Sequence, residues 1–126
     1  MRAIDTNVLV RLLARDDAKQ VAAAERFVKG GAWVSHLVLM EASWVLTSVY
    51  DLAPATIATA MEMLLSHENL TLERADVVAA AVTEFRNRPR LGFSDCLIVE
   101  TARKAGHVPV GTFDQDLGKL EDVQRL

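Results

Sequence analysis

The stretch Met1-Arg2-Ala3-Ile4-Asp5-Thr6-Asn7 decides how the rest of the chain is arranged. Residues 2–5 are expected to form a short apolar strand that ends on the carboxylate of Asp5. A helical pattern follows from Val8, with Asn7 or Asp5 as its N-cap. A strand that leads directly into a helix places Asp5 at the carboxyl edge of a sheet. Open α/β sheets bind ligands at that edge.

Helical and strand patterns alternate along the remainder of the chain. After the helix that begins at Val8, apolar residues recur at helical spacing over 18–29, 35–50, 54–66, 74–86 and 93–104. Short apolar runs predict strands over 32–34, 69–72 and 108–113, with a helical turn over 117–120 and a marginal edge strand over 123–126. This alternation predicts an α/β fold with a mostly parallel, short-stranded central sheet and helices on both faces.

The length and composition fit one domain spanning residues 1–126. Apolar residues make up 51% of the chain, enough for a substantial core, and the net charge of −3 argues against broad, nonspecific coating of nucleic acid. Cys96 is the only cysteine, which excludes an intramolecular disulfide and fits a reducing compartment. Because no run resembles a secretion signal or a membrane span, we expect a cytoplasmic protein without membrane association.

Three further acids, Glu41, Asp95 and Asp114, fall at positions that the same sheet edge could gather with Asp5. Asp5 and Asp114 become neighbours if the first and fourth strands pair. Glu41 interrupts an apolar stripe that contains Leu37, Met40, Trp44, Val45, Ser48 and Val49. An unpaired charge buried there costs several kcal/mol, so it must pair, become protonated, coordinate a cation or reach water at a rim.

Each of the other acids also has a purely structural interpretation. Asp5 and Asp95 can cap or stabilise the start of a helix, and Asp114 can form a turn. Asp116 lies close enough in sequence to take the place of Asp114, although Asp114 directly follows the strand residues Thr112 and Phe113. The joint pattern is more informative than any single acid, because all four carboxylates can reach one edge.

Four clustered carboxylates repel one another, which raises carboxyl pKa values unless a cation is bound. Mg²⁺ or Mn²⁺ suits such a site because both ions prefer carboxylate and water oxygens. The absence of cysteine clusters and of paired histidines argues against zinc. One or two such metals can activate water and stabilise the charge of a phosphodiester during hydrolysis. Hydrogen bonds that orient a carboxylate or a water are expected from Thr6, Asn7, Ser94 and Asp116.

The remaining candidates are less specific. The arginine run Arg86, Arg88 and Arg90 is either a solvated loop or a grip on RNA phosphates near Asp95. Cys96 is expected to pack in the core rather than to react. The two tryptophans, Trp33 and Trp44, are likewise expected in the core rather than as platforms for base stacking.

Four motifs together resemble the PIN-domain family, and within it the VapC-type toxin ribonucleases: Ile4-Asp5-Thr6-Asn7-Val8-Leu9, Glu41 within a helix, Phe93-Ser94-Asp95-Cys96-Leu97-Ile98, and Thr112-Phe113-Asp114. The resemblance implies a three-layer α/β/α fold and a Mg²⁺- or Mn²⁺-dependent endoribonuclease. It assigns the catalytic and metal-binding acids to Asp5, Glu41, Asp95 and Asp114, with Thr6 nearby. It also implies a homodimer and inhibition by a small antitoxin protein, whose tail lies in a groove near the site.

Other protein classes would use these acids differently from a metal-dependent nuclease. A signalling receiver domain needs an acid pair after the first strand and a phosphoacceptor after the third, and the chain supplies neither. A phosphatase with an Asp-x-Asp nucleophile fails because Asn7 occupies the second acid's position. The main alternative is a catalytically inactive PIN-like scaffold that binds RNA or a partner protein. A DNA substrate also stays open, since nothing identified here reads a 2′-hydroxyl.

Overall fold

The computed structural model describes residues 1–126 and has the predicted α/β architecture, with short parallel strands and six α-helices. The elements, in order, are β1 (Arg2–Ala3), α1 (Thr6–Ala14), α2 (Ala18–Val28), β2 (Ala32–Val34), α3 (His36–Ser48), α4 (Pro54–Ser66), β3 (Leu70–Leu72), α5 (Ala75–Asn87), the 3-10 turn η1 (Pro89–Leu91), α6 (Phe93–Ala105), β4 (Val110–Thr112), the 3-10 turn η2 (Leu117–Lys119) and β5 (Val123–Arg125). None of the helices has both the length and the apolar composition needed to cross a membrane.

Local sequence signals explain why the helix starts agree closely with the predictions. Asp5 is the N-cap of α1, and its Oδ1 accepts a hydrogen bond from the Val8 N–H at 3.0 Å. Ser35 caps α3 in the same way, through the Val38 N–H at 3.2 Å. Gly106 ends α6 in the left-handed conformation, at φ 80°, which glycine adopts without a steric penalty. Caps read from sequence therefore position the elements on which the candidate acids lie.

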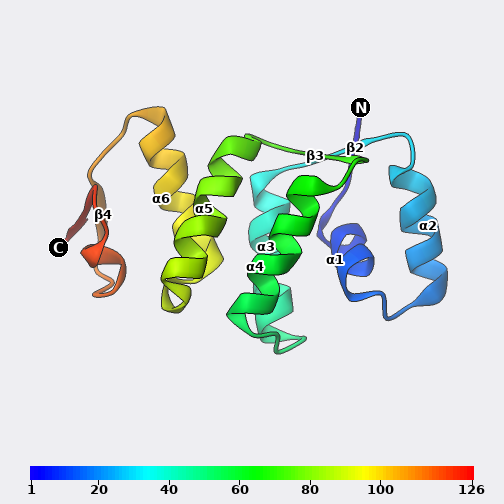
Figure 1. The fold of residues 1–126 in the computed structure, drawn as a ribbon, viewed down its shortest axis with the longest axis horizontal. Coiled ribbons are helices and arrows are strands. Elements are labelled where there is room, and N and C mark those ends of the chain that lie inside the picture. The colour runs from blue at the N-terminus through cyan, green and yellow to red at the C-terminus, as the bar shows by residue number, and fades with distance from the viewer.

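The strands form two separate parallel sheets rather than one. β1, β2 and β3 are hydrogen-bonded in that order, while β4 pairs only with β5. Figure 1 shows β4 beyond α6, at the opposite end of the molecule from α1 and α2. The pairing of the first and fourth strands is therefore absent, because β4 directs its bonds to the C-terminal segment: the Val110 N–H donates to Asp122, and the Leu126 N–H donates to Thr112, each at 2.8 Å.

The core lies between the helices and the three-stranded sheet. α3 packs against α1 and α6, and α5 packs against α4 and α6. Leu39, Leu46, Met61 and Leu97 are among its fully buried side chains. The helices that carry Asp5, Glu41 and Asp95 are consequently neighbours, with α3 in the middle.

The face of α3 that turns toward the core agrees only in part with the predicted one, since Met40 and Val45 pack against the core but are partly buried. The helix buries Leu39, Ala42, Ser43 and Leu46, whereas Leu37, Trp44 and Val49 of the predicted stripe are 73%, 65% and 67% exposed. The expectation that both tryptophans lie in the core is also wrong, since Trp33 is 38% exposed. α3 is apolar on most of its circumference, so helical periodicity alone does not distinguish its two faces.

A polar network fixes the turn between α1 and α2 against the end of α3. The Tyr50 hydroxyl donates to Asp16 at 2.9 Å and accepts from Arg11 at 3.0 Å. Arg11 also donates to Asp16 at 3.0 Å and to Gln20. The hydrogen bond from Tyr50 lowers the pKa of Asp16 below its ordinary value of 3.8, and the nearby Arg11 charge lowers it further.

Candidate functional site

Asp5 lies just after β1, where one of its carboxylate oxygens caps α1 and the other is free to accept a hydrogen bond. Its Oδ1 caps α1, and Oδ2 receives no hydrogen bond from the protein. The side chain is exposed and shares a shallow cleft between α1 and α2 with Asn7. Thr6, the first residue of α1, is half-buried beside it. The capping interpretation of Asp5 is thus correct, and it leaves one carboxylate oxygen available for another ligand.

Glu41 lies on the exposed side of α3, between Leu37 and Trp44 at helical spacing. Its side chain has no ion pair or hydrogen bond within the protein. Of the alternatives considered for Glu41, the rim position that reaches water is therefore the one observed. Its exposure also leaves it free to contact a ligand from outside.

Asp95 and Asp114 are the two predicted acids that the fold brings together. Asp95 lies in the first turn of α6, and desolvation by burial raises its pKa, with repulsion from Asp114 as the second cause. The Asp114 carboxylate accepts from the Leu117 N–H at 2.8 Å, and its own N–H donates to Thr112 at 3.0 Å. Asp114 therefore also forms the turn that its position predicts.

Asp116, the alternative for the last acidic position, has different surroundings. Its carboxylate lies 3.4 Å from the ammonium group of Lys119. The repulsion that raises the pKa of Asp95 comes from Asp114 and not from Asp116. Between the two alternatives, the electrostatic surroundings of Asp95 favour Asp114.

The four acids do not converge on one point in this structure. No group of three or more His, Cys, Asp or Glu side chains is placed to hold a metal ion. Asp5 caps α1 and Glu41 lies on α3, whereas Asp95 lies in the first turn of α6 and Asp114 in the turn after β4. The donor chemistry of the Asp95–Asp114 pair fits Mg²⁺ or Mn²⁺, because two repelling carboxylates offer hard oxygens whose charge a divalent cation neutralises.

A cleft of about 360 Å³ opens beside Asp95, between α3 and the start of α6. Ser43 and Ser94 join its two walls, with their hydroxyl oxygens 3.3 Å apart. Trp44 and Arg90 also line this cleft. The Ser94 hydroxyl therefore contacts Ser43, and its predicted role in orienting Asp95 stays a prediction.

The three arginines of the basic run have different surroundings. Arg86 lies 2.5 Å from Glu62, and Arg88 lies 3.6 Å from Glu84. Arg90 has no acidic partner. Of the three candidates for RNA phosphates, only Arg90 has no acidic partner, and it lines the same cleft as Asp95.

Cys96 follows Asp95 but points into the core. It is fully buried, as predicted, and burial raises the pKa of its thiol to about 12. Nearby carboxylates, first among them Glu84, raise the pKa further. The thiol therefore stays protonated at neutral pH and contributes neither a nucleophile nor a metal ligand.

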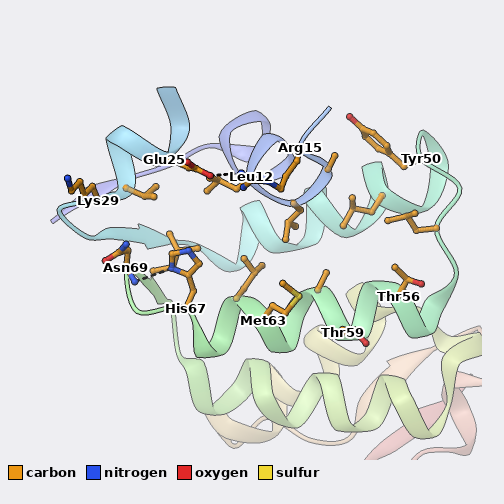
Figure 2. A pocket seen from close by; sticks show the side chains of 18 residues that line it. Leu12, Arg15, Glu25, Lys29, Tyr50, Thr56, Thr59, Met63, His67 and Asn69 are labelled. Atoms are coloured by element: carbon orange, nitrogen blue, oxygen red, sulfur yellow. Dashed lines mark hydrogen bonds and ion pairs between the residues drawn. The ribbon is translucent and has the colours of Figure 1, made fainter. Parts of the chain in front are cut away.

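The largest concavity of the molecule lies away from the acids. It is a groove of about 820 Å³ between α1 and α2 on one side and α4 on the other, and Figure 2 shows Leu12 and Met63 on its facing walls. An ion pair between Arg15 and Glu25, at 2.6 Å, lies at its rim. Sequence analysis did not identify this groove, although the apolar excess of α4 beyond what one core face requires was a signal for it.

The comparisons with known proteins extend these observations. A family model described as PIN domain matches residues 3–123. The chain belongs to the PIN-domain family. PIN domains are generally metal-dependent nucleases, so membership assigns this PIN domain a nuclease-type function. Searches of curated proteins and of solved structures gave no match.

Proposed function

We propose that this PIN domain is an endoribonuclease that hydrolyses RNA phosphodiesters with Mg²⁺ or Mn²⁺. The observation that carries the proposal is the Asp95–Asp114 pair. Asp95 is half-buried at the start of α6, and its ionised form is destabilised first by burial and then by the charge of Asp114. Burial and like charge oppose ionisation unless a cation compensates them. Perturbed carboxyl groups of this kind cluster at functional sites.

Asp95 and Asp114 would hold the metal, with Asp5 and Glu41 completing the acidic set. A bound divalent ion supplies a water of lowered pKa and neutralises charge on the phosphodiester. The chain itself contributes the Ser94 hydroxyl beside Asp95 and the start of α6. That helix has no side-chain cap, and in this proposal the N–H groups of its first turn would bind an anionic phosphate.

Convergence of the four acids requires the β4–β5 sheet to move next to β1. Two features support this rearrangement. β1 has a free outer edge in the three-stranded sheet, and β4 has a free edge opposite β5. Fluorophores on Met1 and Gln124 should move closer together when Mn²⁺ is added, and an unchanged transfer efficiency in the presence of bound metal would contradict the rearrangement.

Cleavage assays test the proposed activity directly. Purified protein, freed of any copurified partner, is incubated with a panel of structured RNAs in Mg²⁺, Mn²⁺ or EDTA, alongside Asp5→Asn in metal. Cleavage that requires metal and disappears in the variant supports the nuclease. If the protein binds RNA but cleaves it in none of these reactions, the inactive scaffold is favoured. If it also cleaves DNA of matched sequence, the substrate is not limited to RNA.

The proposal includes a place in a toxin–antitoxin pair, with this chain as the toxin. The groove between α2 and α4 supports a protein partner, because it is lined mainly by apolar side chains and no segment of the chain fills it. Exposed Leu37 on α3 and Val49 just after its end similarly support a homodimer. Sedimentation of the pure chain should give a dimer mass. Met63→Glu in the groove should abolish binding of a cognate antitoxin while preserving cleavage.

A further inference from the structure

We propose that the cleft between α3 and the start of α6 is a binding site for one nucleotide of single-stranded RNA, with Trp44 stacking on the base and Arg90 binding a phosphate. The inference deepens the proposed function and rests on it, because it names side chains that would hold the RNA substrate. It assigns a role to two residues that lie outside the acidic set.

The exposure of Trp44 is the first observation behind this site. An indole is among the largest apolar side chains, yet 65% of this one is accessible although α3 has core-facing positions nearby. Trp44 lies at the cleft wall, within the same cavity as Asp95. An exposed aromatic face is the surface on which unpaired bases stack, and such stacking accepts any base.

The charges of the cleft provide the second observation. Arg90 is the only cationic residue lining it, and Asp95 is the only acidic one. Arg90 lacks an acidic partner, unlike Arg86 and Arg88, so its guanidinium is available to a phosphate oxygen. The hydroxyls of Ser43, Thr47 and Ser94 add hydrogen-bonding groups along the same walls.

The size of the cleft selects the occupant. Its volume of about 360 Å³ lies at the lower end of the range for small-ligand sites, so it suits one nucleotide and not a duplex. A base must leave its own stack to reach Trp44, which single strands, loops and bulges permit. Asp95 lines the same cleft, so a nucleotide held here would lie beside one carboxylate of the acidic set.

Tryptophan fluorescence tests this site in isolation. The Trp33→Phe variant leaves Trp44 as the only tryptophan of the chain. It is titrated with a ten-nucleotide single-stranded RNA of degenerate sequence, in EDTA at low salt, so that binding is measured without cleavage. We expect saturable quenching of Trp44, and weaker quenching by a hairpin in which every base is paired.

Matched variants identify the contributing side chains. Trp44→Leu should weaken binding, measured by fluorescence anisotropy of labelled RNA, by about 5- to 140-fold, the range for loss of one base–aromatic stack. Arg90→Ala should reduce the slope of log affinity against log salt by about 0.7, as for one lost phosphate contact on a single strand. Arg88→Ala, which removes an already paired arginine, should leave the affinity within about twofold.

The outcomes separate this site from the nuclease proposal. Quenching by RNA with no cleavage in any metal would preserve the site and refute the nuclease. Metal-dependent cleavage with no quenching and no effect of Trp44→Leu on KM would refute the site and preserve the nuclease. Absence of RNA binding by the Trp33→Phe and unsubstituted proteins would overturn the site. A Trp44→Leu change in sedimentation mass with unchanged RNA affinity would instead place Trp44 in an interface between proteins.

Discussion

Replacing Asp5 by asparagine and by alanine should separate its structural role from its proposed catalytic role. The Asp5 carboxylate caps α1 through the Val8 N–H at 3.0 Å. Asparagine caps a helix about as well as aspartate, whereas alanine loses about 1 kcal/mol. For 126 residues the entropy of unfolding is about 0.26 kcal/mol per kelvin, so Asp5→Ala should lower the melting temperature by about 4 °C. Asp5→Asn should change it by about 1 °C or less.

Calorimetric melting of both variants in EDTA, followed by cleavage assays in Mn²⁺, measures the two effects. We expect both variants to lose cleavage and only Asp5→Ala to lose stability. An equal fall in melting temperature for the two variants would refute the capping argument, since the asparagine amide oxygen can accept the same hydrogen bond. Unimpaired cleavage by Asp5→Asn would refute the role of this carboxylate at the metal.

Three further predictions concern the core, the metal and pH. Leu39→Ala should lower the free energy of unfolding, measured with denaturant, by about 2–5 kcal/mol, because Leu39 is buried. Leu37→Ala should lower it by no more than about 0.5 kcal/mol, because Leu37 is exposed. Equal losses would contradict the face assigned to α3. Asp114→Asn should weaken Mn²⁺ binding at least about tenfold by titration calorimetry, whereas Asp116→Asn should retain it, and the reverse order would exchange their roles. Asp16→Asn should lower the melting temperature at pH 7, because ionised Asp16 stabilises the fold. The pKa of Asp16 in the folded protein lies below its ordinary value of 3.8, so this difference in melting temperature should disappear as the pH falls through that lowered pKa. A deficit that persists unchanged at pH 2 would show that the carboxylate charge is not its cause.

Local signals in the sequence predicted the elements well because their causes are local. The caps at Asp5 and Ser35, the proline that begins α4 at Pro54 and the glycine that ends α6 at Gly106 all act within one turn of a helix. The observed element bounds differ from the predicted ones by only a few residues, even for the short β5. The PIN-like α/β class follows from the order of these elements.

Pairing and orientation were harder to predict because they depend on distant residues. Nothing within Val110–Thr112 shows whether β4 joins β1 or β5, and the structure has the second pairing. On α3, apolar residues lie on both faces, so the sequence alone could not show that Trp44 is exposed and Leu39 is buried. The candidate acids were identifiable one by one, but the proximity of Asp95 to Asp114 depends on how the C-terminal segment packs beside α6.

The inert thiol of Cys96 has a practical consequence for studying this domain. A fully buried sulfur with a pKa of about 12 does not react with maleimides in the native state, so dyes can be attached to cysteines introduced at the surface without first removing it. The same thiol becomes reactive whenever the start of α6 opens. Its modification rate under native conditions therefore measures the free energy of that opening, and a ligand bound at Asp95 should slow the reaction in proportion to its occupancy.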